Sequence, residues 1–259
     1  MKTINLFLKI HTTSLSPDGQ IISLAIVSEE LIHVKVKEFI KTGEKQLISS
    51  SDGTKFFYAE FTDYDLNRCD NFVKENIVSK LLYTNHEPKL LGYFKDDTGF
   101  GDTKEINSRL TNWLSQFSEY KLNFIVDCGW FAWYKFIELM GKWEEVNLMF
   151  PLPENISDDN MGFGRYDTYI KVGLPKLTAN FPPVCQDLNE LIALKKGINV
   201  SEAFELDRDA ILWPETNKNI EDAKQKLMKD GFPLNYQFNA LWDAKVTKEI
   251  YNKLIWKNT

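Results

Sequence analysis

Residues 123–128 read Asn-Phe-Ile-Val-Asp-Cys, and residues 130–140 follow almost without a break. The first stretch predicts a short buried strand that ends in a carboxylate, Asp127, because an apolar run of this length is typical of a buried strand. The second stretch predicts a helix from about Trp130 to Met140. A buried strand that passes directly into a helix is the repeating unit of α/β proteins.

The chain before this unit has the pattern of a β-meander. Residues 4–10 and 20–27 are apolar runs, and a Ser-Pro-Asp-Gly turn lies between them. In residues 32–37 apolar and polar side chains alternate, as in a half-buried antiparallel strand. Residues 56–61 predict a further strand. Antiparallel strands followed by β/α alternation indicate an α/β fold with a mixed five-stranded sheet flanked by helices, in which residues 4–10 are central.

Helices and one irregular excursion account for the rest. Asp102 followed by Glu105 resembles a capping box at the start of a helix that extends to Phe117. Residues 151–184 contain five of the nine prolines and predict an irregular insertion. No repeat or linker divides the chain, so residues 1–259 are expected to form a single domain. The other predicted helices cover residues 66–82, 186–196 and 239–255, and Gly99-Phe100-Gly101 is expected to be a plain turn.

Charge and cysteine usage narrow the class of protein. The 259 residues include 31 Lys and Arg against 37 Asp and Glu, a formal net charge of −6. This balance argues against a large basic groove that holds nucleic acid by charge alone, although a nuclease can draw positive charge from its metals. The three cysteines form no C-x-x-C pair, which predicts a cytoplasmic protein without a disulfide framework or a zinc ribbon. No run approaches the ~18 apolar residues of a membrane helix, so no membrane partner is expected.

Three short segments carry the candidate chemistry. The first is Leu-Lys-Ile-His-Thr-Thr-Ser-Leu at residues 8–15, with Ile-Ile-Ser at 21–23 in the strand after it. The second is Ile-Val-Asp at 125–127, and the third is Asn-Ala-Leu-Trp-Asp-Ala at 239–244. In order and spacing, over nearly the whole chain, they resemble the DEDD-type 3′–5′ exonucleases of the ribonuclease-H-like fold. The similarity is greatest to the branch with polymerase proofreading subunits, ribonuclease T and small bacterial 3′–5′ exoribonucleases.

The resemblance implies a two-metal phosphodiesterase site. In that family four carboxylates clamp two divalent ions, Mg²⁺ or Mn²⁺, and a His five residues before the fourth acid is the general base. The first motif, Asp-x-Glu, puts two acids on one face of a strand because strand side chains alternate. Here Asp127 matches the third acid and Asp243 the fourth, but Lys9 and His11 replace the first two and Phe238 replaces the base.

Charge arithmetic explains how such a site can persist without metal. Four carboxylates and two divalent cations sum to zero, whereas Asp127 and Asp243 with Lys9 and a neutral or protonated His11 sum to −1 or 0. The Lys9 ammonium is therefore expected to replace the metal charge and to repel an incoming divalent ion. No metal or other cofactor is expected, and Asp127 and Asp243 would be the ligands if one bound.

Part of the family's binding surface is retained. Thr12, Thr13 and Leu15 match the turn that contacts the terminal nucleotide in the family. Trp130, at the start of the predicted helix, is either a packing residue or a face on which a base stacks, and such stacking contributes ~1–3 kcal/mol per base.

The sequence leaves three functions open. The preferred one is a catalytically degenerate exonuclease-like protein that binds a single-stranded 3′ end, a nucleotide or a protein partner. A working 3′–5′ exonuclease would need acids from elsewhere, such as Asp18, Glu29 or Glu60, and none has the right offset. The third is a nuclease-dead subunit in a defence or toxin–antitoxin complex. The resemblance also implies a homodimer, since relatives often pair.

Overall fold

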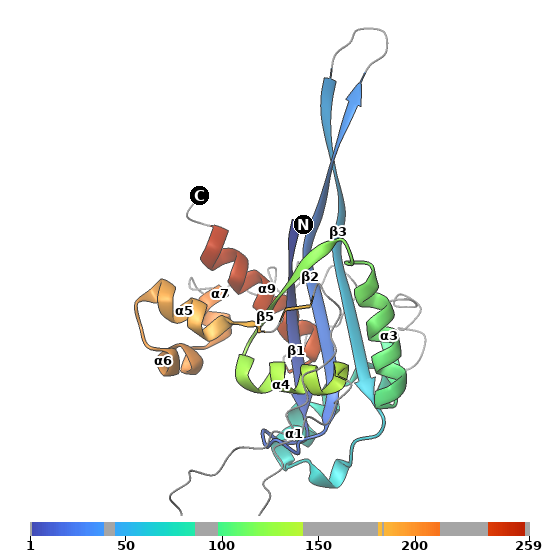
Figure 1. Ribbon diagram of the computed structural model, residues 1–259. Coiled ribbons are helices and arrows are strands. Elements are labelled where there is room, and N and C mark those ends of the chain that lie inside the picture. Colours follow the sequence, from blue (N-terminus) through green and yellow to red (C-terminus); the bar gives the residue numbers. More distant parts are fainter. Residues whose placement is uncertain are drawn as a thin grey trace, which may run out of the picture.

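A six-stranded mixed sheet forms the centre of the protein, with helices on both of its faces (Figure 1). The computed structural model describes residues 2–38, 45–85, 98–141, 181–182, 184–212 and 238–256. The strand order is β4-β3-β2-β1-β5-β6. The strands are β1 (Lys2–Thr12), β2 (Ile21–Glu38), β3 (Lys45–Phe61), β4 (Thr98–Gly101), β5 (Tyr120–Val126) and β6 (Gln186–Asp187).

The sheet combines an antiparallel half with a parallel half. β1 pairs antiparallel with β2, and β2 pairs antiparallel with β3, so the expected antiparallel opening of the chain is confirmed, with three strands where four runs were predicted. β5 lies parallel to β1 on its other side, and β6 lies parallel to β5. The expected central position of residues 4–10 is also confirmed, because β1 has neighbours on both edges.

Alternation along β1 divides the core into two layers. Ile4, Leu6, Leu8 and Ile10 face one layer, to which α3 (Thr103–Ser115) and α4 (Gly129–Met140) contribute. Phe7 faces the other layer, with α5 (Leu188–Lys196), α6 (Val200–Glu205), α7 (Arg208–Leu212) and α9 (Ala240–Trp256). Because side chains along a strand alternate, Lys9 and His11 lie on the same face of β1 as Phe7.

The prediction of five strands was wrong. Residues 98–101 form the edge strand β4, parallel to β3, where a plain turn was expected. Gly99 lies close to α3, and a Cβ built there would approach the Ile106 side chain to 2.7 Å. β6 has only two residues and no alternation that a sequence pattern can reveal.

The predicted helix over residues 66–82 is also wrong. The segment is divided into η1 (Leu66–Arg68), α1 (Asn71–Asn76), η2 (Val78–Lys80) and α2 (Leu82–Asn85), of which η1 and η2 are 3₁₀ turns. Asp65 and Asp70 each accept a hydrogen bond from a backbone N–H two or three residues later. Two caps within five residues begin two separate short helices, because an Asp cap competes with continuation of the preceding helix.

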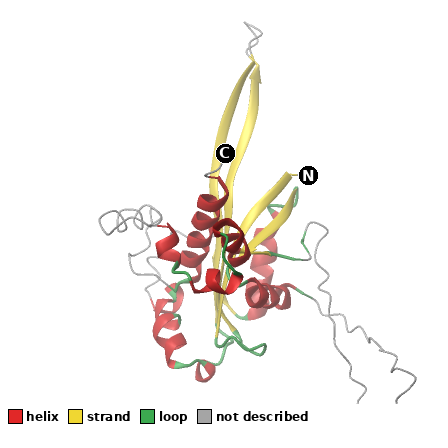
Figure 2. Ribbon diagram, turned by 90° about the vertical axis from the view of Figure 1, so that its left-hand side faces the viewer, coloured by secondary structure: helices red, strands yellow, loops and turns green. Residues whose placement is uncertain are grey.

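β2 and β3 are longer than the runs that predict them. The runs at 20–27 and 32–37 belong to the one strand β2, whose pairing with β3 is irregular between Val27 and Ile32. Pairing with β1 ends at Ser28, but pairing with β3 continues to Glu38 and Lys45. The hairpin therefore projects from the sheet as a two-stranded ribbon (Figures 1 and 2).

Two expectations lie outside or at the limits of the described residues. The irregular insertion at 151–184 is described only at residues 181, 182 and 184, and the single-domain prediction stays a prediction. In the described ranges, no helix combines the length and the apolar character that crossing a membrane requires.

A buried carboxylate joins β3 to α2 in the core layer that contains α9. Glu60 of β3 is fully buried, and its oxygens accept hydrogen bonds from the Tyr58 hydroxyl at 2.7 Å and from Thr84 N at 3.0 Å. The backbone N–H groups of Leu82 and Tyr83 and the Thr84 hydroxyl also donate to it, so Glu60 caps α2.

The same network reaches the start of α9. Asn239 donates through Nδ2 to the Tyr58 hydroxyl at 3.2 Å and to the Lys80 carbonyl at 3.0 Å. Its Oδ1 accepts from Leu241 N at 3.0 Å. Through Asn239, Glu60 therefore helps to fix where α9 begins.

We expect Glu60→Gln to lower the free energy of unfolding by about 2–3 kcal/mol, because a hydrogen bond to a charged group contributes ~1.5–3 kcal/mol. The Gln amide also turns a donor toward the N–H groups that now donate to Glu60. Thermal unfolding measures the change, and the exposed Glu119→Gln is the matched control. Equal melting temperatures of the two variants would contradict this role.

Candidate functional site

Lys9 lies between two carboxylates that come from distant parts of the chain. Its Nζ is 3.7 Å from Asp127 Oδ2 and 3.8 Å from Asp243 Oδ2. Asp127 follows β5, the parallel neighbour of β1, and Asp243 lies in the first turn of α9. The three side chains are only 17–21 % exposed. The sequence-based expectation that both acids converge on Lys9 is confirmed.

His11 adds a third contact to this cluster. It lies two residues after Lys9 on the same face of β1, and its Nε2 is 3.0 Å from Asp243 Oδ2. Ser23 is its partner in the β1–β2 register, and Ser23 Oγ is 3.4 Å from His11 Nδ1. The imidazole is thus held from both sides, at the position where the resemblance implies the second acid.

Arg208 supplies a second cation that the sequence interpretation missed. Its Nη2 donates to Asp127 Oδ1 at 3.0 Å and to Asn189 Oδ1 at 2.5 Å. Asn189 Nδ2 is 3.4 Å from the same oxygen of Asp127. Arg208 begins the five-residue helix α7, where neither periodicity nor a motif singles it out. We refer to Lys9, His11, Asp127, Asp243 and Arg208 as the Lys9 cluster.

The ion pairs outweigh the effect of burial on two of these groups. Burial lowers the pKa of Lys9, but the carboxylates of Asp127 and Asp243 raise it more, so the pKa lies above its ordinary 10.5. Burial raises the pKa of Asp127, but Lys9 and Arg208 hold it below its ordinary 3.8. Both side chains are therefore charged at neutral pH. The cluster sums to 0 with a neutral His11 and to +1 with a protonated one.

Phe238 is held in an unusual backbone conformation next to the cluster. Its φ is 71°, in the left-handed region that non-glycine residues seldom adopt. Its ring packs edge-on against Phe72, with centroids 5.6 Å apart. Phe238 borders a cavity of about 200 Å³, together with Lys9, Arg208 and Trp242. At the position that the resemblance assigns to the general base, an apolar ring therefore lines the cavity.

The four predicted nucleic-acid contacts fall into two groups. Thr12, the last residue of β1, and Thr13 after it are buried: the Thr12 hydroxyl donates to Ser14 O at 2.6 Å, and the Thr13 hydroxyl accepts from Gln20 N at 3.0 Å. Leu15 and Trp130 are each 70 % exposed. Only the second pair offers a surface to a ligand, so helix packing does not account for Trp130.

The acids that an active exonuclease would recruit are engaged elsewhere. Glu60 caps α2, Asp18 pairs with Arg68, and Glu29 accepts from Asn5 Nδ2 at 2.9 Å. In the parts of the chain that the structure describes, no three His, Cys, Asp or Glu side chains form a group able to hold a metal ion.

No protein-family model matches this chain, and no curated protein sequence matches it. The geometry and the charges of the Lys9 cluster are therefore the basis for its function.

We expect Lys9→Ala to lower the free energy of unfolding at neutral pH by about 2–4 kcal/mol. Removing one partner of a buried ion pair costs ~3–5 kcal/mol, and here Arg208 still neutralises Asp127. Adding Asp243→Asn to Lys9→Ala should recover part of the loss, because Asp243 is the carboxylate that loses its ammonium, whereas Arg208 still compensates Asp127. Urea unfolding of the two variants and wild type measures both effects. Additive losses in the double variant would contradict the ion-pair geometry.

The depressed pKa of Asp127 gives a pH dependence of known sign. Its contribution to stability is present above the ordinary pKa of 3.8 and is lost as the pH falls through the lower pKa of the folded state. Wild type should therefore lose more stability than Asp127→Asn as the solution is acidified from neutral pH through this range. Urea unfolding at successive pH values measures the difference, and parallel curves would exclude it.

Proposed function

We propose that this protein is a catalytically inactive relative of the 3′–5′ exonucleases that binds the 3′ end of single-stranded nucleic acid, or a nucleotide, without cleaving it. The observation that carries this proposal is the position of Lys9. Its ammonium lies within 4 Å of both acids that the resemblance retains, where a divalent ion would be held.

The topology of the sheet supports the proposed relationship. Strands β3, β2 and β1 are antiparallel, and β5 and β6 continue from β1 in parallel pairing. A ribonuclease-H-like sheet has this arrangement, and here β4 adds a parallel strand at the β3 edge. The acid after β5 and the acid on the last described helix meet at the central strand, as the motif order implies.

The residues present do not fit a two-metal centre. Asp127 and Asp243 are already neutralised by Lys9 and Arg208, so the cluster has no negative charge left to attract a divalent cation. A metal between the two acids would also lie against the Lys9 ammonium, which repels it.

A general base is also missing from its expected place. Phe238 has no group that accepts a proton, and its ring is packed against Phe72. His11 is hydrogen-bonded to Asp243 and lies on the central strand instead. Among the described residues of the cluster, the acids and the base that the family chemistry requires are therefore not assembled.

Nucleic-acid binding does not need the catalytic acids or the general base, because it uses other side chains. Leu15 and Trp130 are exposed at the end of the sheet where β1 and β5 end, and aromatic–base stacking needs no metal. The cavity beside Lys9 supplies an apolar wall, Phe238 and Trp242, next to the cationic Arg208. The exposed Trp130 suits stacking on a base, and the small mixed pocket suits a terminal nucleotide.

We expect the purified protein to bind a fluorescent single-stranded oligonucleotide without shortening it when Mg²⁺ or Mn²⁺ is present. Anisotropy measures binding, and gel analysis of the same samples measures length. Trp130→Ala should weaken binding about tenfold or more, since stacking contributes ~1–3 kcal/mol per base. Phe204→Ala, which removes another exposed aromatic side chain, on α6, is the control and should not change affinity.

Two outcomes would contradict the proposal in different ways. Trimming from the 3′ end that disappears in Asp127→Asn would establish an active exonuclease with unusual ligands. Absence of binding to single-stranded DNA, single-stranded RNA and mononucleotides would leave a protein partner as the function of the degenerate site.

We also expect metal affinity to return when the acids are restored. Lys9→Asp with His11→Glu rebuilds the first motif, and Mn²⁺ should then raise the melting temperature by mass action on the folded state. Wild type and the uncharged control Lys9→Asn with His11→Gln should show no such increase. Stabilisation of wild type by Mn²⁺ equal to that of the rebuilt variant would show that Lys9 does not exclude metal.

A further inference from the structure

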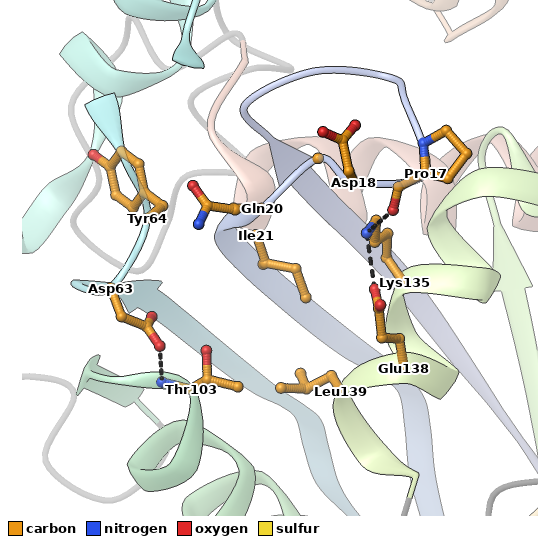
Figure 3. Close-up of a pocket in the computed structure, with 11 residues that line it drawn as sticks. Pro17, Asp18, Gln20, Ile21, Asp63, Tyr64, Thr103, Lys135, Glu138 and Leu139 are labelled. Atoms are coloured by element: carbon orange, nitrogen blue, oxygen red, sulfur yellow. Dashed lines mark hydrogen bonds and ion pairs between the residues drawn. The ribbon is translucent and has the colours of Figure 1, made fainter. Parts of the chain in front are cut away.

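A second cavity lies on the α3–α4 side of the molecule, between the β1–β2 turn and those two helices (Figure 3). Its volume is about 280 Å³, and none of the residues that line it belongs to the Lys9 cluster. Drug-sized ligands occupy pockets of ~300–1,000 Å³, so this one suits a ligand of about amino-acid size.

One end of the cavity carries a charge pair of opposite signs. Lys135 of α4 is only 3 % exposed, and its Nζ donates to the Pro17 carbonyl at 2.6 Å and to Glu138 Oε2 at 2.8 Å. An ammonium has three donors, so one N–H of Lys135 is left for an acceptor in the cavity. Glu138 is 41 % exposed, and its other oxygen is available to a donor.

The opposite end carries a single carboxylate. Asp63 accepts one hydrogen bond, from Thr103 N at 3.0 Å. In the described part of the chain it has no ion-pair partner, whereas Asp18, on the rim, pairs with Arg68. Figure 3 shows Asp63 and Lys135 at opposite sides of the cavity, with Ile21 and Leu139 between them.

The cavity thus presents three chemically distinct regions. A Lys–Glu pair at one end matches a carboxylate next to an ammonium. An apolar middle, Ile21 and Leu139, matches an aliphatic chain. A lone carboxylate, Asp63, matches a second cation at the far end. Counting Arg68 with Asp18, the cavity has one uncompensated negative charge, which favours a ligand of net charge +1.

We propose that this cavity binds a free basic α-amino acid, lysine or arginine. The α-carboxylate accepts from Lys135 Nζ, the α-ammonium donates to Glu138, and the side-chain cation donates to Asp63 across the aliphatic stem. This site is independent of the proposed nucleic-acid function, because it shares no residue with the Lys9 cluster.

Ligand analogues test each region on the unmodified protein. Calorimetric titration at constant ionic strength should show saturable binding of L-lysine or L-arginine. Norleucine lacks the side-chain cation, and 1,5-diaminopentane lacks the carboxylate, so each should bind about tenfold more weakly or worse, as expected for losing a charged hydrogen bond. Norleucine binding as tightly as lysine, or no saturable binding of either basic amino acid at millimolar concentration, would overturn the proposal.

Variants test which group of the ligand binds at each end of the cavity. Asp63→Asn keeps an oxygen for Thr103 N and should abolish the preference for lysine over norleucine. Lys135→Met keeps the buried stem and should abolish the preference for lysine over 1,5-diaminopentane. Glu119→Gln, an exposed acid that does not line the cavity, is the control and should keep both preferences. Preferences that persist in Asp63→Asn would also overturn the assignment, whether or not Lys135→Met folds.

Discussion

The constraint on which the site depends is the pairing of a mostly buried ammonium, Lys9, with two carboxylates from other elements. An uncompensated charge in such a place is costly, so β1, the end of β5 and the first turn of α9 must stay together. β1 and β5 contribute side chains to both core layers, and α9 packs in one of them. The ion pairs and the apolar packing therefore require the same arrangement of strands and helix.

Arg208 completes the compensation of charge at this site. With Lys9 alone, Asp127 and Asp243 would retain one net negative charge, and a cation could still be attracted. With Arg208 on Asp127, the two acids are fully compensated by side chains of the same chain. The site is thus better described as a closed ion-pair network than as a metal centre that lacks some ligands. Buried ion pairs contribute little to net stability, but removing one partner is costly because the other charge is left uncompensated.

Carboxylates with assigned partners recur throughout the molecule. Glu60 accepts from α2 and, through Tyr58 and Asn239, helps to fix the start of α9, which carries Asp243. Asp187 accepts from Gly129 N at 2.7 Å and from Asn189 N at 2.7 Å, so one side chain holds the starts of α4 and α5. These contacts position the elements around the Lys9 cluster. Asp63 differs from these two in that it accepts a single hydrogen bond and borders a cavity.

Apolar runs in the sequence indicated the antiparallel opening of the chain and the strand that leads to Asp127, and the resemblance to the exonuclease motifs implied that Asp127 and Asp243 converge on Lys9. Alternation of apolar and polar residues can be read directly from the sequence, and because strand side chains alternate, residues two apart such as Lys9 and His11 lie on one face. Three features depend on tertiary contacts. Arg208 and Asn189 contact Asp127, residues 66–85 form several short helices, and residues 98–101 pair with β3. A cation's partner and a short edge strand depend on which surfaces meet in the folded chain, and neither leaves a periodic pattern in the sequence.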